Sequence, residues 1–103
     1  MDKPYKLCYL PIFQKDLEET IRYISVNLNN PKAAERLLED TEKAILERLE
    51  SPLAFAPFPS VKTRKHPYYQ IRIRNFSVFY VVIGDMMEVR RFIYSRRDFE
   101  SLL

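Results

Sequence analysis

The residues best suited to chemistry in this sequence are arginines that alternate with aromatic side chains in its last third. Arg72 and Arg90 are expected to share one face of a sheet with Phe79 and Phe92 and, beyond them, Tyr94. A guanidinium group holds phosphate oxygens through two parallel hydrogen bonds, and aromatic rings stack on unpaired bases. This face is therefore a candidate nucleic-acid surface. A solvated sheet face with cross-strand ion pairs is the alternative.

Few other side chains suggest chemistry. Glu88 lies on the same predicted face and could act as a general base, although a carboxylate paired with an arginine is the commoner arrangement. The chain has one cysteine, one histidine and one glycine, so we expect no metal, no cofactor and no glycine-rich phosphate loop. Cys8 is expected to be a small buried side chain, and His66, which precedes a proline, a surface residue.

Size and charge describe a small soluble protein. The chain has 103 residues, 47% of them hydrophobic, which predicts one domain over 1–103 without a membrane span. Its beginning does not resemble a signal peptide, and a reducing cytoplasm fits the single cysteine. Residues 1–60 carry eight Lys or Arg against ten Asp or Glu, whereas residues 61–103 carry nine against four. The basic second half suggests a polyanion or an acidic partner.

Two helices are predicted between an N-terminal strand and the rest of the chain. The strand runs from Tyr5 to Leu10 and ends at Pro11. Apolar residues then recur at spacings of three and four, which predicts a helix. They are Phe13, Leu17, Ile21, Ile24 and Leu28. Asn30 is the expected N-cap of a second helix that begins at Pro31 and ends near Glu50, and the short link favours an antiparallel hairpin.

The remaining chain is predicted to be a loop and three strands. The loop over 51–67 contains four prolines, and Phe55 and Phe58 are expected to tuck onto the core. Strands follow over 68–74, 76–83 and 86–94, with a helical turn over 98–103. The order β-α-α-β-β-β predicts an α+β protein in which a helical hairpin covers one face of a small, mainly antiparallel sheet.

Turn chemistry predicts the strand register. A hairpin turn at Gly84-Asp85 sets Phe79 opposite Arg90 and Ser77 opposite Phe92, and a turn at Arg74-Asn75 sets Arg72 opposite Ser77. The face toward the helices then holds Tyr69, Ile71, Ile73, Phe76, Val78, Tyr80, Val82, Val89 and Ile93. The open face holds Gln70, Arg72, Ser77, Phe79, Glu88, Arg90, Phe92 and Tyr94. Arg91 falls on the core face, which indicates either a side chain reaching out at an edge or a bulge that shifts the register.

Four pieces of the chain together resemble a known family. They are YKLCYLP, KDLEETIRYI, NPKAAERLLEDTEKAILERLESP and YYQIRIRNFSVFYVVIGDMMEVRRFIYSRRD. Their order and spacing resemble the RelE/ParE superfamily, the toxins of bacterial type II toxin–antitoxin, or plasmid stabilisation, modules. The resemblance implies a cytoplasmic growth inhibitor neutralised by a cognate antitoxin, whose complex with the toxin binds promoter DNA chiefly through the antitoxin. It also implies one of two targets, since ParE-like members inhibit DNA gyrase and RelE-like members cut mRNA on the ribosome without a metal.

The resemblance also supplies candidate site residues. Arg72 and Arg74 match the basic positions of the family's second strand, Arg96 or Arg97 matches the arginine after the last strand, and Tyr94 is an aromatic candidate at the strand end. Two positions depart from the ribonuclease branch, whose arginine early in the third strand falls at Ser77 and whose tyrosine near the end falls at Leu102 or Leu103. Together with the helical hairpin and the YSRRD ending, this favours gyrase inhibition slightly. An mRNA endonuclease and a non-toxic antitoxin-binding member are the alternatives.

Overall fold

The computed structural model describes residues 4–60 and 62–103. Its elements are β1 (Lys6–Tyr9), α1 (Pro11–Arg22), the π-helical segment η1 (Tyr23–Asn27), α2 (Pro31–Leu49), β2 (Tyr69–Ile73), β3 (Phe76–Ile83), β4 (Met86–Tyr94) and α3 (Phe99–Leu102). The α+β class and the order of elements are confirmed, with a last helical turn where one was predicted.

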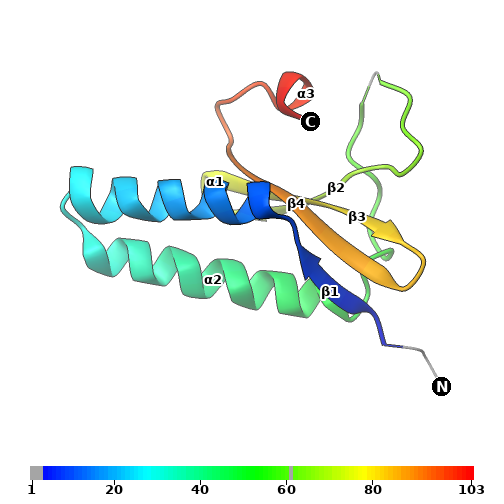
Figure 1. Ribbon diagram of the computed structural model, residues 1–103, viewed down its shortest axis with the longest axis horizontal. Helices are drawn as coiled ribbons and strands as arrows, with labels where there is room; N and C mark the ends of the chain where they lie inside the picture. Colours follow the sequence, from blue (N-terminus) through cyan, green and yellow to red (C-terminus); the bar gives the residue numbers. More distant parts are fainter. Residues whose placement is uncertain (1–3, 61) are drawn as a thin grey trace.

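The four strands form one mixed sheet in the order β1-β4-β3-β2 (Figure 1). Strands β2, β3 and β4 follow one another as antiparallel neighbours. Strand β1 pairs in parallel with β4. A parallel pair needs a long connection between its strands, and here the whole chain between β1 and β4 supplies it. The last strand to be reached along the chain therefore lies between the first strand and β3.

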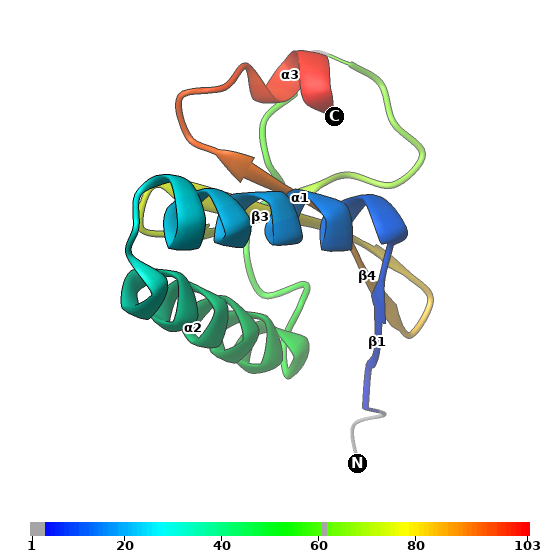
Figure 2. The same ribbon diagram turned by 60° about the vertical axis from the view of Figure 1, so that its left-hand side comes forward.

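The helical hairpin forms as its terminal residues predict. The side-chain oxygen of Asn30 accepts a hydrogen bond from the Ala33 N–H at 3.2 Å, and Pro31 is the first helical residue. Asn29 takes the left-handed conformation that reverses the chain, with φ at 49°. Helix α1 packs against β4 and α2 against β2, so the hairpin covers one face of the sheet (Figure 2).

The main core lies between the hairpin and the sheet, as the sequence pattern predicts. Its buried members are Phe13, Leu37, Ile45, Tyr69, Ile71, Ile73, Val78, Tyr80, Met87, Val89 and Phe92. Tyr80 is fully buried, and its hydroxyl donates to the carbonyl of Pro52 at 2.7 Å while accepting from Arg48 at 3.0 Å. The guanidinium of Arg48 also lies 3.8 Å from the ring centre of Phe55, which is 54% exposed. Phe55 therefore covers Arg48 and does not enter the core as expected.

The predicted register holds for β2 with β3 and fails part-way along β4. Arg72 lies opposite Ser77 and Val81 opposite Glu88, as predicted. A bulge then leaves Arg90 unpaired, so Phe79 lies opposite Arg91 and not Arg90. Because one extra residue exchanges the two faces of a strand, every face assigned beyond this point was wrong.

The bulge reverses four assignments on β4. Phe92 belongs to the main core, and Ile93 lies on the other face. Tyr94 lies opposite Phe76, whose ring centre is 5.5 Å from its own, on the hairpin side of the sheet. Arg91 leaves the core face to which the pattern had assigned it, which resolves the conflict seen in the sequence.

The face predicted to be open is covered by a second apolar cluster. Its buried members are Tyr68, Phe79, Val81 and Ile93, packed against Phe58, Phe99, Leu102 and Leu103. Figures 1 and 2 show α3 on the side of the sheet away from α2. Phe79 and Ser77 are fully buried there. The prediction of an open face of arginines and aromatic rings was therefore wrong, because the loop and the C-terminal segment supply apolar side chains that cover its aromatic part.

Candidate functional site

A groove of about 770 Å³ runs between the hairpin and the second half of β4. On the hairpin side it is lined by Asp16, Glu19, Thr20, Tyr23, Ile24, Leu28, Asn30 and Ala33. On the sheet side it is lined by Asn75, Phe76, Arg91, Phe92, Ile93, Tyr94, Arg97 and Leu102. Two of the candidate site residues, Tyr94 and Arg97, are therefore part of this groove.

The groove exists because β1 is too short to cover all of β4. Strand β1 pairs only with residues 86–89, and α1 begins directly afterwards. Helix α1 then supplies a side chain where a strand would have supplied a backbone carbonyl: the N–H of Phe92 donates to Asp16 Oδ2 at 3.1 Å. Strand alternation directs the carbonyl of Phe92 and the backbone of Tyr94 toward the same side. The groove thus follows an edge of the sheet that lacks a neighbouring strand.

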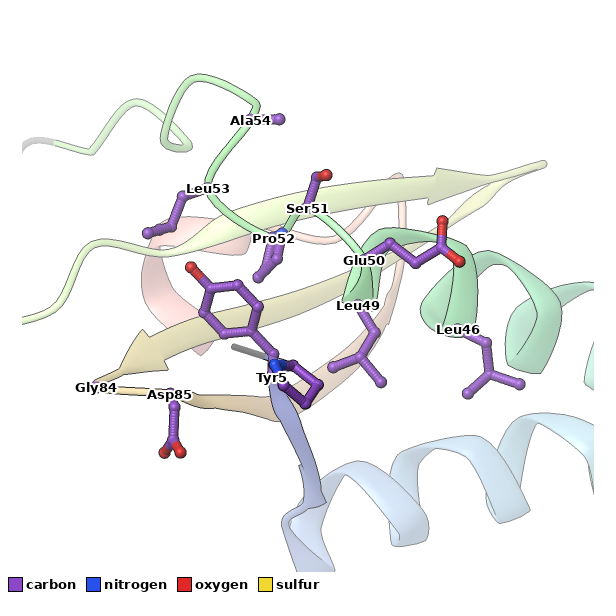
Figure 3. Close-up of a pocket in the computed structure, with 11 residues that line it drawn as sticks. Tyr5, Leu46, Leu49, Glu50, Ser51, Pro52, Leu53, Ala54, Gly84 and Asp85 are labelled. Carbon is purple, nitrogen blue, oxygen red and sulfur yellow. The ribbon is translucent and has the colours of Figure 1, made fainter. Parts of the chain in front are cut away.

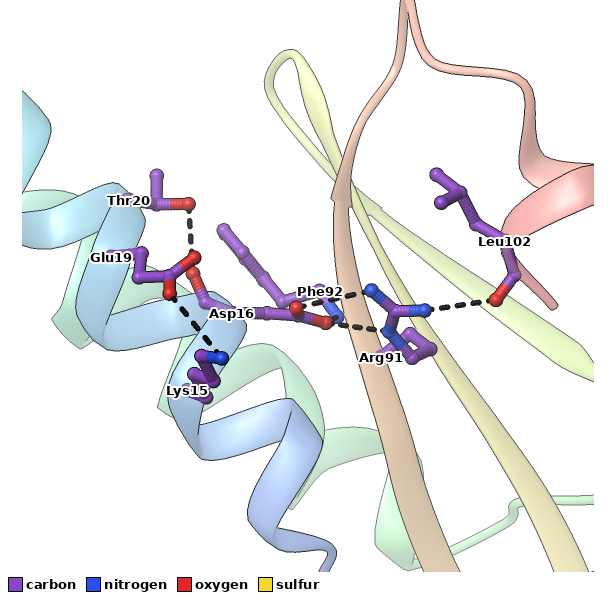
Figure 4. A network of polar contacts seen from close by, with 7 residues as sticks. All are labelled: Lys15, Asp16, Glu19, Thr20, Arg91, Phe92 and Leu102. Carbon is purple, nitrogen blue, oxygen red and sulfur yellow. Dashed lines mark hydrogen bonds and ion pairs between the residues drawn. The ribbon is translucent and has the colours of Figure 1, made fainter.

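Asp16 and Arg91 form the polar wall of the groove (Figure 4). Arg91 Nε and Nη2 donate to the two carboxylate oxygens of Asp16 at 2.7 and 3.1 Å, and Arg91 Nη1 donates to the carbonyl of Leu102 at 2.8 Å. The hydrogen bonds to Asp16 raise the pKa of Arg91 above its ordinary value. Arg91 is thereby committed to holding α1, β4 and α3 together and is not an open anion-binding group.

The rest of the groove is largely apolar and accessible. Phe76 and Phe92 stack with ring centres 5.0 Å apart. Above them Tyr23, Leu28 and Tyr94 remain 53%, 55% and 40% exposed. Tyr23 begins the π-helical segment, a distortion often found at functional sites. Large apolar side chains gathered around a groove and left exposed indicate a surface for another protein.

The structure brings four of the five candidate residues to one end of the sheet. The Arg97 N–H donates to the carbonyl of Tyr94 at 2.9 Å, and Arg96 lies exposed between them. The Ser95 N–H donates to the carbonyl of Asn75 at 2.8 Å, which joins this segment to the β2–β3 turn that carries Arg74. Arg74 itself forms an ion pair with Asp40 of α2. This end of the sheet is therefore basic and partly paired.

Arg72 lies apart from that group. It is exposed on β2 opposite the buried Ser77, on the sheet face away from the hairpin, whereas Tyr94 lies on the hairpin side. Glu88, the possible general base, is held by Arg90 Nε at 2.8 Å and is only 16% exposed. The guanidinium of Arg90 also lies 5.8 Å from the ring centre of Tyr68. The candidate base and the candidate phosphate-binding residues do not converge on one point.

Sequence reasoning missed the hairpin side of the groove. Leu28 was assigned to the buried helix face, yet it lies at the hairpin tip and is 55% exposed. The signal was present in the sequence, because Tyr23, Val26 and Leu28 crowd the last turn of a helix whose other end is joined to the sheet. Asp16 could not be found in this way, since its role depends on the bulge in β4.

The family model described as the ParE toxin of the type II toxin–antitoxin system parDE matches residues 8–99. The chain belongs to the ParE toxin family. A comparison with curated protein sequences finds no match for this family member. In the described part of this ParE-family toxin, no helix is long and apolar enough to cross a membrane.

Two solved structures share the fold of this ParE-family toxin. A chain of the chromosomal ParDE toxin–antitoxin system from P. aeruginosa matches with a TM-score of 0.71 and 18% identity, over 87% of this chain and 95% of that one. A chain of the archaeal RelE-RelB complex from Pyrococcus horikoshii OT3 matches with a TM-score of 0.56 and 16% identity, over 93% of this chain and 100% of that one. At these identities the likeness shows the shared fold.

Proposed function

We propose that this ParE-family toxin inhibits bacterial DNA gyrase by binding it, and that a cognate antitoxin neutralises it. The observation that carries the proposal is the second apolar cluster, in which Phe79, Phe99 and their neighbours fill the sheet face that the sequence suggested for nucleic acid. A filled face offers no space for a scissile phosphate. The surfaces that remain accessible, including the groove along β4, are suited to protein partners.

The chemistry required for RNA cleavage supports the same proposal. Cleavage needs a base to activate the 2′-hydroxyl and cations to stabilise the charge on the phosphate. Glu88 is occupied by Arg90, and Arg72 and Tyr94 lie on opposite faces of the sheet. Binding inhibition requires none of these groups to act together. A complementary surface is sufficient.

The groove along β4 is the proposed seat of the antitoxin. Both solved structures described above come from toxin–antitoxin systems. The exposed Tyr23, Leu28 and Tyr94 would receive apolar side chains of an antitoxin segment, and the exposed Arg97 at the rim would pair with its carboxylates. The outward-facing carbonyl of Phe92 and N–H of Tyr94 can hydrogen-bond to an extended segment, whereas the Tyr94 carbonyl accepts from Arg97.

A supercoiling assay with purified gyrase and relaxed plasmid tests this function. We expect the toxin to suppress supercoiling, and an equimolar amount of antitoxin to restore it. A parallel translation reaction with purified ribosomes should yield intact mRNA. Normal supercoiling at a large molar excess of toxin would refute gyrase inhibition. Cleavage of the mRNA would show that the protein acts as a ribosome-dependent nuclease.

The basic end of the sheet favours mRNA cleavage as the second candidate. Arg74, Tyr94, Arg96 and Arg97 lie close together there, and such a group could hold RNA phosphates. On this alternative, Arg97→Ala and Arg72→Ala would abolish cleavage without unfolding the protein. The same two variants would leave gyrase inhibition in place if the groups serve only to hold RNA.

A further inference from the structure

A second hollow of about 890 Å³ lies at the other end of the hairpin from the β4 groove. Its walls come from Pro4 and Tyr5 just before β1, the end of α2 with the turn that follows, and the turn between β3 and β4. It shares no residue with the groove along β4. We call it the α2-end cleft. Neither the packing of the core nor the proposed binding of the antitoxin explains why it exists.

The cleft presents apolar side chains from separate parts of the chain (Figure 3). Tyr5, Pro52 and Leu53 gather at its centre, and Leu46 projects from the last turns of α2. Leu46 and Leu53 are 55% and 53% exposed. Side chains of this size are usually turned away from water, and several around one hollow indicate a docking surface.

The charges around the cleft indicate the chemistry of its occupant. A smaller hollow shares Leu46 and Glu50 with it and is otherwise lined by Glu39, Glu42, Lys43 and Glu47. Within residues 4–60 and 62–103, neither Glu47 nor Glu50 forms an ion pair, while Asp85 on the opposite wall is paired with Lys6 at 3.9 Å. The apolar centre is therefore flanked by carboxylates that lack cationic partners, in a chain whose net charge is +3.

We propose that the α2-end cleft is the surface that binds the target enzyme, and that it docks onto a cationic, DNA-binding face of that enzyme. This inference rests on the proposed inhibition of gyrase. An enzyme that handles DNA carries lysines and arginines along the path of the phosphates. Glu47 and Glu50 would pair with such cations, and Leu46 and Leu53 would contact the apolar stems that long basic side chains present. The basic end of the sheet would be repelled by the same face.

This assignment separates the two partners in space. The antitoxin occupies the groove along β4, and the target occupies the opposite end of α2. Helix α2 has 19 residues, so its ends lie about 28 Å apart at 1.5 Å per residue. Because the seats are separate, substitutions in the cleft should affect inhibition of the target and leave antitoxin affinity unchanged.

Charge reversal in the intact toxin tests the inference. The double variant Glu47→Lys/Glu50→Lys reverses two carboxylates at the cleft. Glu18→Lys/Glu35→Lys makes the same change in charge at two exposed positions that line neither the cleft, nor the smaller hollow beside it, nor the groove along β4. We measure the toxin concentration that halves supercoiling by gyrase, at low and at moderate salt, together with antitoxin affinity and the thermal midpoint of each variant. Leu53→Ala is a third variant, which removes an exposed apolar contact without a change in charge.

The inference predicts that the concentration for half inhibition of supercoiling is at least tenfold higher for Glu47→Lys/Glu50→Lys than for the wild type. For Leu53→Ala it should be several-fold higher. The Glu18→Lys/Glu35→Lys control should change inhibition less than threefold, and antitoxin affinity should stay the same in all three variants. If the wild type and both cleft variants inhibit gyrase at the same concentration, the inference is overturned and the proposed inhibition of gyrase is supported. A wild-type toxin that does not inhibit gyrase at all would overturn both proposals.

Discussion

Asp16 of α1 and Arg91 of β4 meet across the end of β1 and are joined through both oxygens of the carboxylate. Their side chains are 15% and 19% exposed, so solvent screens the pair only weakly. Asp16 also accepts the N–H of Phe92, and Arg91 donates to the carbonyl of Leu102. This ion pair therefore joins the hairpin, the unpartnered end of β4 and the C-terminal segment.

Replacement of Asp16 by Asn should destabilise the protein. The variant leaves Arg91 mostly buried without its counter-charge, and we expect the free energy of unfolding to fall by about 2 kcal/mol. Urea unfolding at neutral pH measures the change. Glu19→Gln is the control, since Glu19 is exposed and its contact with Lys15 is 4.0 Å long. Equal effects of the two substitutions would show that the bidentate pair adds nothing.

Tyr80 should make stability depend on alkaline pH. Burial raises its pKa above 10.0, so the unfolded chain loses this proton at a lower pH than the folded protein does. The stability gained from the neutral hydroxyl is complete below pH 10 and is lost as pH rises through the folded-state pKa. At pH 8 the wild type should exceed Tyr80→Phe by about 1 kcal/mol, and this difference should shrink above pH 10.

The comparison with Tyr80→Phe isolates that hydroxyl. Tyr9, whose pKa is also raised by burial, and every lysine are present in both proteins, so their titration cancels. Urea unfolding at several pH values from 8 upward gives the difference directly. A difference that stays constant with pH would mean that the Tyr80 hydroxyl loses its proton equally readily in the folded and unfolded states.

Phe99 should hold the C-terminal segment against the sheet. Its ring centre lies 4.9 Å from that of Phe79 and 5.9 Å from that of Phe58. We expect Phe99→Ala to cost about 2 kcal/mol, because it leaves a gap in the second apolar cluster. It should also speed cleavage by trypsin at Arg96 and Arg97. Ser101→Ala, on the same short helix and exposed, should leave the cleavage rate unchanged.

The hairpin tip should contribute to antitoxin affinity and little to folding. Leu28→Ser removes a side chain that is 55% exposed, so the thermal midpoint should change by less than about 2 °C. Affinity for the antitoxin should fall at least tenfold if Leu28 fills an apolar contact. Val26→Ser is the matched control, because Val26 is 70% exposed and does not line the groove. Unchanged affinity in Leu28→Ser would place the antitoxin elsewhere.

The elements were predictable because local signals agree with the fold. Asn30-Pro31 starts α2 where expected, and the turns at Asn75 and Gly84 set the strand pairing. The position of the bulge at Arg90 could not be predicted from the sequence. The bulge arises where β4 passes beyond β1, and Asp16 of a helix distant in sequence holds the strand there. Only the conflict over Arg91 indicated it.

The second apolar cluster shows where the candidate site could not be read from the sequence. Alternation marks which residues share a face but not whether another segment covers that face. Phe58, Phe99 and Leu102 were visible in the sequence, yet their places depend on how a proline-rich loop and a short tail cross the sheet. Arg72 and Tyr94 were grouped by the register, and the bulge separates them.

The central position of β4 also governs the order in which a nascent chain can fold. Strand β4 is the neighbour of both β1 and β3, and it is the last strand to be synthesised. At about 5–20 residues per second, the ribosome needs a few seconds to pass from the end of α2 to the end of β4. During that time β1 has no partner strand and the apolar side of the hairpin is uncovered. Each newly made chain therefore passes through an interval in which its sheet is incomplete and it depends on its surroundings for protection from aggregation.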